Sequence, residues 1–201
     1  MHLYLIRHAE SIANAFGVVQ GHGDYPLTEL GKQQAQLLGE WMKNIPLQAI
    51  YSSDLSRAYE TATAISKHHH IQVKKWPLIR EIYLGSFEGM TKEEIISKFP
   101  QLINESILTS EMGGAESILS ITSRCKKTVQ FLMENHIDDH VALVSHGGFI
   151  SILLTYFMLS QSWESIQRPF IIHNTGVSKV HINKKGMIKF HYINQTAHLQ
   201  H

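Results

Sequence analysis

The chain has 201 residues, 43% of them hydrophobic and 17% charged, which is typical of one globular domain and excludes extended disorder. A formal net charge of +1 provides no global field toward nucleic acid or an anionic membrane, so we expect neither as a partner. A single cysteine, Cys125, excludes an intramolecular disulfide, and no basic leader precedes the first apolar run, so we expect a cytoplasmic protein. The sequence indicates no particular oligomeric state.

The first third of the chain alternates short apolar runs with helical patterns. Residues 3–6 are apolar without interruption, which is typical of a strand buried on both faces, and residues 14–26 form a glycine-rich loop. Thr28 is the expected cap of the first long helix. Residues 49–51 predict the next strand, and Asp54 is expected to cap the helix after it.

The middle of the chain has few long periodic patterns. Residues 74–90 are rich in turns, residues 91–99 predict one short helix, and residues 101–114 show no clear pattern. We expect residues 82–114 to form a small cap on the domain. From Glu116 onward, apolar residues at three- and four-residue intervals predict a long amphipathic helix.

The last third predicts one strand, one buried helix and three further strands. These are residues 141–144, the helix 149–159, and the strands 170–172, 177–182 and 188–193. The last two strands are joined by a hairpin turn over residues 183–186. Helices between the early strands and a hairpin at the end predict one α/β domain over residues 1–201. We expect a three-layer α/β/α sandwich around a mixed, mostly parallel sheet.

Basic residues follow three of the predicted strands. Arg7 and His8 come directly after the first strand, Arg57 closely follows the second, and His146 begins a turn with paired glycines. The carboxyl ends of strands in such a sheet face one crevice, so these side chains are expected to converge. Two guanidiniums can grip a phosphoryl group from two sides. A neutral His8 can attack phosphorus, and His146 can donate a hydrogen bond to a phosphoryl oxygen.

Glu81 is the candidate general acid, because a leaving alkoxide needs a proton and an attacking water must later lose one. Because Arg80 is its neighbour, Glu81 could equally well form an ion pair with Arg80 on the surface. Glu10 is a second candidate for the general acid. Polar and small residues are further candidates for binding substrate at the mouth of the site. They are Ser11, Asn14, Gln20, Gly21 and Gly147. Ser11 or Asn14 is at least as well placed to cap a helix or turn.

Fourteen histidines raise the question of a zinc site. The consecutive run His68–His70 cannot converge on one metal ion from a helix face. The sequence contains no His-Glu-x-x-His motif and no cysteine pair. We therefore expect no metal and no cofactor.

Six segments of the chain together resemble one known family. They are Leu5-Ile6-Arg7-His8-Ala9-Glu10, residues 52–58, Glu81 with residues 85–89, Glu116-Ser117, Ser145-His146-Gly147 and residues 194–199. With these motifs the chain resembles the histidine phosphatase superfamily, the group around cofactor-dependent phosphoglycerate mutase. The resemblance implies that His8 becomes phosphorylated and that Glu81 donates the proton. It implies a phosphate pocket of Arg7, Arg57 and His146, lined also by Asn14 and Gln20.

The chain departs from this family's pattern in two places and is short in a third. Ala9 stands where many members have glycine, and Ala115 interrupts a Gly-Glu-Ser pattern. Mutases of the family carry a longer insertion between the positions of Glu81 and His146, which shields the phosphoenzyme from water. The short stretch here predicts a metal-independent phosphatase that hydrolyses small phosphate monoesters through a phosphohistidine.

Two alternatives to this phosphatase remain open. They are a phosphoglycerate mutase and a catalytically inactive phosphoryl-binding protein. The partner is expected to be a small phosphorylated metabolite. Sugar phosphates, phosphoglycerate, ribosyl phosphates and phosphorylated proteins all remain possible substrates.

Overall fold

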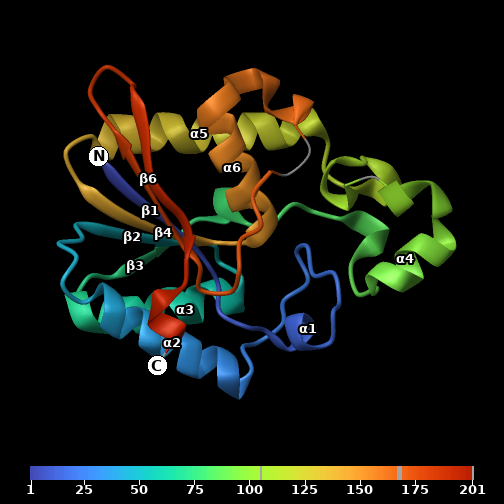
Figure 1. The fold of residues 1–201 in the computed structure, drawn as a ribbon, viewed down its shortest axis with the longest axis horizontal. Helices are drawn as coiled ribbons and strands as arrows, with labels where there is room; N and C mark the ends of the chain where they lie inside the picture. The colour runs from blue at the N-terminus through green and yellow to red at the C-terminus, as the bar shows by residue number, and fades with distance from the viewer. Residues whose placement is uncertain (105, 167–168, 201) are drawn as a thin grey trace.

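The computed structural model describes residues 1–104, 106–166 and 169–200. Within these residues the strands form one six-stranded sheet of order β3-β2-β4-β1-β5-β6 (Figure 1). The strands are β1 (His2–Arg7), β2 (Ala49–Ser52), β3 (Val73–Lys75), β4 (His140–Ser145), β5 (Val177–Ile182) and β6 (Ile188–Gln195). β4 pairs in parallel with β1 and β2, and β2 with β3, whereas β5 is antiparallel to β1 and β6. The predicted mixed, mostly parallel sheet is confirmed.

Helices cover both faces of this sheet (Figure 1). They are α1 (Ile12–Ala15), α2 (Glu29–Met42), α3 (Ser56–His69), α4 (Lys92–Lys98), α5 (Ile118–His136) and α6 (Gly147–Leu159). Leu3 and Leu5 of β1 are fully buried on the face that packs against α5 and α6. Tyr4 and Ile6 are buried on the other face, against α2 and α3. Side chains of a strand point alternately to opposite faces, so the uninterrupted apolar run of β1 supplies two cores. The three-layer architecture is confirmed.

The structure corrects two predicted elements and adds others, among them the short helix α1 and the strand β3. Asp54 does not cap α3; the capping position is Leu55, and the Asp54 carboxylate instead accepts two hydrogen bonds from Arg80. Residues 170–172 are not a strand, because side chains rather than a neighbouring strand satisfy their carbonyls, as where Ser151 donates to Phe170. The short strand β3 was not expected, since its two lysines give it no apolar pattern. Thr28 caps α2 as predicted.

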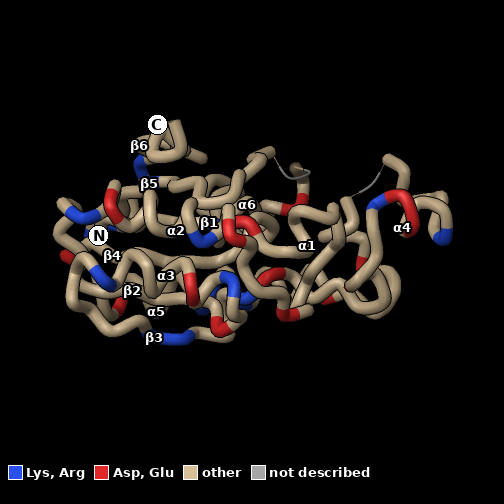
Figure 2. Tube along the Cα trace, turned by 90° about the horizontal axis from the view of Figure 1, so that it is seen from below, with Lys and Arg blue, Asp and Glu red and all other residues tan. Residues whose placement is uncertain are grey.

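The segment that was expected to form a cap is built from α4 and short 3-10 turns. The turns are at Gly85–Phe87, Pro100–Asn104, Ile107–Thr109 and Met112–Gly114, and position 105 lies outside the described residues. Figures 1 and 2 show α4 at the end of the molecule away from the sheet. Phe87, Ile95 and Leu102 are buried and anchor the segment to the core shared with α5 and α6. Its action as a cap stays a prediction.

Two sequence-based expectations about burial can be compared with this fold. Cys125 lies fully buried on α5, and burial raises the pKa of its thiol to about 12, as expected for an inert cysteine. α6 is the predicted buried apolar helix and has 13 residues. Within the described ranges, no helix combines the length and the apolar character that a membrane span needs.

Candidate active site

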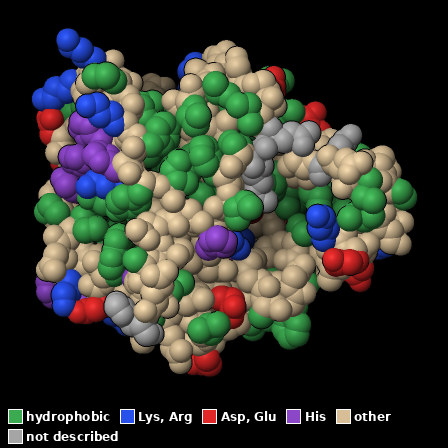
Figure 3. Space-filling view, in the orientation of Figure 1, with side chains coloured by type: hydrophobic (Ala, Val, Ile, Leu, Met, Phe, Trp, Pro, Cys, Tyr) green, Lys and Arg blue, Asp and Glu red, His purple; other side chains and the backbone are tan. Residues whose placement is uncertain are grey.

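A cavity of about 610 Å³ opens at the carboxyl ends of β1, β2 and β4. The hollow is visible near the middle of the face in Figure 3. Eight of the residues singled out from the sequence line it: Arg7, His8, Asn14, Gln20, Gly21, Arg57, Glu81 and Gly147. Ser11 and His146 are fully buried and are not among the lining residues. The topological argument from strand ends thus holds for most of the set.

His8 is fixed at the end of β1 in one tautomer. Its backbone N–H donates to Ser145 (2.9 Å), and its Nδ1 donates to the Ala9 carbonyl (2.7 Å). That bond leaves Nε2 with the free electron pair of the ring. Burial, with the nearby charges of Arg57 and Arg7, lowers the pKa of His8 well below its usual value of 6.5. The ring is therefore neutral at neutral pH, and its Nε2 has the electron pair that a nucleophile needs.

His146 lies directly behind His8, with the two ring centroids 5.1 Å apart. Its Nε2 lies 2.8 Å from the Ser53 hydroxyl, and Arg57 Nε donates to its Nδ1 at 3.3 Å. Burial and the charge of Arg57 lower the pKa of His146 well below 6.5, so this ring is neutral too. In this arrangement the ring hydrogen points to Ser53. A hydrogen bond from Nδ1 to a phosphoryl oxygen requires the other tautomer, in which the Ser53 hydroxyl donates to Nε2.

Ser53 was not singled out from the sequence, although it stands within the motif that contains Arg57. Its position directly after a strand end was the available signal. Because a hydroxyl can both donate and accept, Ser53 can pair with either tautomer of His146.

Arg57, in the first turn of α3, is fully buried. Its Nη1 donates to the Gly23 carbonyl (2.7 Å) and its Nη2 to the Gly21 carbonyl (2.9 Å). Gly21 has a φ of +48°, and a Cβ there would lie 2.0 Å from a carboxylate oxygen of Glu88, so any other residue would be strained and would displace that carboxylate. Burial lowers the pKa of Arg57 from its usual value, but a guanidinium stays charged at neutral pH. The loop around Gly21 and the cation thus form one wall of the cavity.

Arg7 approaches the cavity from β1. Its Nη1 donates to the Ile172 carbonyl (2.7 Å), which orients the guanidinium along the cavity wall. The same bond uses a carbonyl that a strand partner would otherwise have taken. The incorrect strand prediction for residues 170–172 and the placement of Arg7 therefore have one cause.

A polar network supports the mouth of the cavity. Ser11 accepts a hydrogen bond from the backbone of Asn14 as the cap of α1, and its hydroxyl donates to Gln20 (2.8 Å). Asn174 donates to the side-chain oxygen of Asn14 (3.1 Å) and to the His8 carbonyl (3.0 Å). Ser11 therefore takes the capping role that the sequence left open. Asn174 was missed, since it lies outside any regular element or recognised motif.

The carboxylate of Glu81 sits at the N-terminus of α6. It accepts hydrogen bonds from the backbone N–H groups of Gly148 (3.0 Å), Phe149 (2.9 Å) and Ile82 (3.0 Å). A helix N-terminus favours a carboxylate in this position. Glu81 is not in an ion pair with Arg80, which binds Asp54 instead, so the surface-pair interpretation is wrong.

The rival carboxylate lies elsewhere. Glu10 accepts a hydrogen bond from the Thr28 hydroxyl (2.7 Å) and is not among the residues that line the cavity. Among the described residues, no group of three or more His, Cys, Asp or Glu side chains is arranged to hold a metal ion. The run His68–His70 lies at the end of α3.

Comparison with known proteins agrees with this arrangement. A family model described as "Histidine phosphatase superfamily (branch 1)" matches residues 3–196. Phosphoserine phosphatase 1 of Hydrogenobacter thermophilus is 33% identical over 203 residues, covering 98% of this chain and 93% of that protein.

Two solved structures share the fold over 98% of this chain and 98% of their own. One is Bacillus stearothermophilus YhfR, with a TM-score of 0.85 and 28% identity. The other is a phosphoserine phosphatase from Entamoeba histolytica in complex with 3-phosphoglyceric acid, with a TM-score of 0.80 and 29% identity. The similarity extends over the whole sheet and both helical layers.

Proposed function

This chain belongs to the histidine phosphatase superfamily, and from that membership we propose that it is a metal-independent phosphatase. It hydrolyses small phosphate monoesters through a phosphohistidine at His8. The observation that supports this most strongly is the state of His8, which is neutral, has Nε2 unprotonated and lines the cavity together with Arg7 and Arg57. A nucleophile and two phosphate-binding cations in one cavity are what phosphoryl transfer needs.

The first half of the reaction transfers the phosphoryl group to the protein. Nε2 of His8 attacks phosphorus, the bond from phosphorus to the ester oxygen breaks, and Glu81, which enters the cycle as the protonated carboxylic acid, donates its proton to the leaving oxygen and becomes a carboxylate. Arg7 and Arg57 bind the equatorial oxygens as their charge develops. His146 adds a hydrogen bond from Nδ1 to one of these oxygens when Ser53 donates to its Nε2 and Arg57 Nε, which donates to Nδ1 in the free protein, binds the phosphoryl group instead.

The second half releases phosphate. A water molecule attacks phosphorus, the carboxylate of Glu81 takes up a proton from that water, and the bond from phosphorus to Nε2 breaks. His8 returns to its neutral form, and inorganic phosphate leaves. One carboxyl group therefore serves as acid in the first step and as base in the second.

The cavity also supports a proposal about the substrate class. Its outer wall contains a lysine, Lys92, and apolar side chains that include Ile103, Ile107 and Leu108. A volume of about 610 Å³ is within the usual range for a small-molecule site. We therefore infer a small phosphorylated acid, whose second anionic group meets Lys92. The relatives named for phosphoserine, and the complex with 3-phosphoglyceric acid, support this class.

The test is phosphate release from a panel of monoesters in the presence of a chelator. The panel contains phosphoserine, 3-phosphoglycerate, glucose 6-phosphate and 4-nitrophenyl phosphate. Wild type is compared with His8→Ala and with a control, His68→Ala, on the exposed end of α3. Chelator-resistant release that only His8→Ala abolishes supports the proposal. Isomerisation of phosphoglycerate without release would favour a mutase, and tight phosphate binding without release would favour an inactive binding protein.

A further inference from the structure

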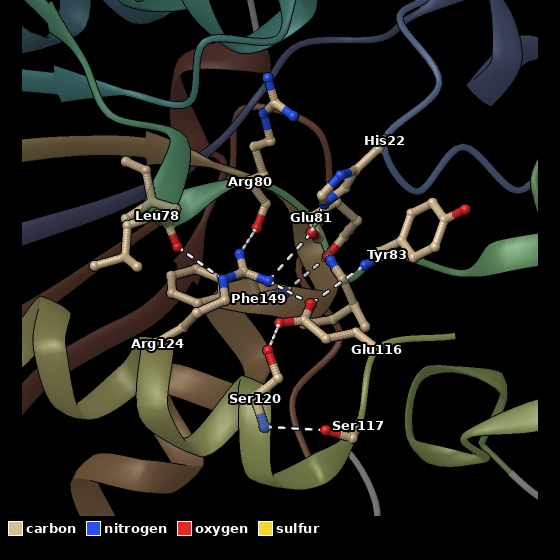
Figure 4. Close-up of polar contacts among 12 residues, drawn as sticks. His22, Leu78, Arg80, Glu81, Tyr83, Glu116, Ser117, Ser120, Arg124 and Phe149 are labelled. Carbon is tan, nitrogen blue, oxygen red and sulfur yellow. Dashed lines mark hydrogen bonds and ion pairs between the residues drawn. The ribbon is translucent and has the colours of Figure 1, made fainter. Parts of the chain in front are cut away.

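A second charged cluster lies behind Glu81, on the side away from the reacting groups. Arg124 of α5 reaches under the backbone that carries Glu81 (Figure 4). Its Nε donates to the Leu78 carbonyl (2.9 Å), its Nη2 to the Arg80 carbonyl, and its Nη1 to the Glu81 carbonyl (3.4 Å). One guanidinium therefore binds three carbonyl groups within four residues of chain.

Arg124 is itself held in place by two neighbours. Its Nη1 forms an ion pair with the Glu116 carboxylate (2.6 Å), and its guanidinium carbon lies 4.7 Å from the centre of the Phe149 ring. The side chains of Arg124 and Glu116 are only 12% and 10% exposed. A paired guanidinium of this kind is well shielded from water, so its geometry is well defined.

Glu116 also fixes the chain on the other side of Glu81. Its backbone N–H donates to the Tyr83 carbonyl (2.8 Å), and its carboxylate accepts from the Tyr83 N–H (3.4 Å) and the Ser120 hydroxyl (2.7 Å). Figure 4 shows the Glu116 carboxylate, just before α5, between Arg124, Ser120 and the backbone of Tyr83. Residues on both sides of Glu81 are thereby tied to α5 and to the residue just before its N-terminus.

His22 completes the arrangement from the cavity loop. Its Nε2 donates to the Glu81 carbonyl (2.9 Å), so that carbonyl has donors from two separate elements. The carboxylate end of Glu81 is fixed as well, by N–H groups of α6. The bonds from Arg124 fix the position of the Glu81 backbone relative to α6. They therefore set how far the carboxyl group of Glu81 extends into the cavity.

We propose that Arg124, anchored by Glu116, is a positioning residue for proton transfer by Glu81. The proposal rests on the proposed function, because it assigns Arg124 to the acid–base half of that reaction. Proton transfer needs a heavy-atom separation close to hydrogen-bond distance, and small displacements reduce it strongly. Weakening the ion pair or the carbonyl contacts should therefore slow reactions that need the proton and spare those that do not.

The experiment compares two esters that differ in their need for an acid. 4-Nitrophenyl phosphate has a good leaving group, whereas 2-phenylethyl phosphate releases a basic alkoxide. For Arg124→Lys and Glu116→Gln we expect kcat/KM, which reports formation of the phosphoenzyme, to fall about tenfold on the alkyl ester and less than about threefold on the aryl ester. KM for the alkyl ester should change less than about twofold, because the phosphate-binding groups are untouched. Lys126→Gln, exposed on the same helix, is the matched control and should behave as wild type.

A double-variant cycle separates positioning from general stability. When Glu81→Gln has already removed the acid, Arg124→Lys should cost less than about twofold further on either ester. Equal losses on both esters, or a full additional loss in the Glu81→Gln background, would overturn the positioning role and leave the phosphatase proposal intact. A wild-type protein that releases phosphate from neither ester, nor from phosphoserine or 3-phosphoglycerate, would overturn the proposed function itself, and the role of Arg124 with it.

Discussion

The inner and outer walls of the cavity are built in different ways. The inner wall is formed at the carboxyl ends of β1, β2 and β4, and its His8 and Arg57 are buried and hydrogen-bonded to backbone carbonyls. The outer wall is formed by α4 and by 3-10 turns, where Lys92 is exposed and Ile103 is 62% exposed. The inner wall suits chemistry that needs fixed geometry, whereas the outer wall can vary with the substrate at little cost to the fold.

The largest loss of activity should come from substitution of His8, the proposed nucleophile on the inner wall. His8→Ala should lower kcat by about 10⁴-fold or more, because no other group can form the phosphoenzyme. The small side chain is compatible with the buried site, so the far-UV circular dichroism spectrum should match that of wild type. Phosphate release that persists near the wild-type rate would show that the inner wall does not supply the nucleophile.

The next effect concerns the proton donor on the same wall. Glu81→Gln should lower kcat/KM for alkyl phosphates by about 10²- to 10⁴-fold, but for 4-nitrophenyl phosphate by less than about tenfold, because kcat/KM reports formation of the phosphoenzyme and not its hydrolysis, in which Glu81 is the base. Glutamine keeps the size of the side chain and can still accept from the N-terminus of α6. The two rates are measured on the same preparation, and a uniform loss on both esters would remove Glu81 as the acid.

Arg57 should affect activity and stability together, since its guanidinium both faces the cavity and holds the Gly21 loop. Arg57→Ala should lower kcat/KM by about 10²- to 10³-fold through loss of charge stabilisation. It should also lower the free energy of unfolding by about 3 kcal/mol, because two carbonyls lose their donor. Urea unfolding measures the second effect. An inactive but fully stable variant would contradict the structural half of the argument.

A substitution on the outer wall should have a smaller and more selective effect. Lys92→Ala should raise KM for phosphoserine and 3-phosphoglycerate about three- to fivefold, as expected for one partly solvated charge pair of up to about 1 kcal/mol. KM for 4-nitrophenyl phosphate and kcat for all three should stay within about twofold. Lys98→Ala, at the other end of α4, is the control. A large fall in kcat for Lys92→Ala would show that the two walls do not divide the work in this way.

The smallest expected effect is on the pH dependence of stability. It comes from a histidine cluster at the other end of the sheet, away from both walls of the cavity. His2 of β1 stacks against His140 of β4 and His181 of β5, with centroids 4.4 and 4.6 Å apart. Burial, with the charges of these neighbours and of Lys179 and the N-terminal amine, lowers the pKa of His2 from 6.5 to about 4. The unfolded chain therefore binds the proton more readily, and stability falls as pH drops from about 6.5 toward 4.

Urea unfolding at several pH values tests this dependence. His2→Gln should reduce the slope of unfolding free energy against pH in that window and leave it unchanged above pH of about 7. His68→Gln, on the exposed end of α3, should keep the wild-type slope. An unaltered slope in His2→Gln would remove the stack as a source of the pH dependence.

The residues of the inner wall differ in how far the sequence could predict them. The positions of His8, Arg7 and Arg57 in the cavity were predictable because strand ends in a parallel sheet meet at one edge, and each residue ends, directly follows or closely follows an apolar run. For Glu81 the sequence left two interpretations open, a general acid and a surface ion pair with Arg80. Nothing in the local sequence shows that α6 provides the hydrogen-bond donors of its carboxylate. Its contacts come from residues 148 and 149, far along the chain.

The remaining differences have the same physical origin. Asp54 is a good capping residue by type, but tertiary contact with Arg80 takes its carboxylate away from α3. Residues 170–172 have the apolar content of a strand, but side chains take up their carbonyls. Ser53, Asn174 and Arg124 act through contacts that are distant in sequence, which a local pattern cannot show.

The most direct test is to trap the phosphoenzyme. Wild type is mixed with phosphoserine, quenched in alkaline detergent within a single turnover, and analysed by intact mass and by peptide mapping. We expect one added phosphoryl group on His8 that is stable in base and lost in acid. It should be absent in His8→Ala and form and decay fast enough to account for kcat. Rapid turnover with no phosphoryl group on His8, or with the group on another residue, would contradict the proposed function.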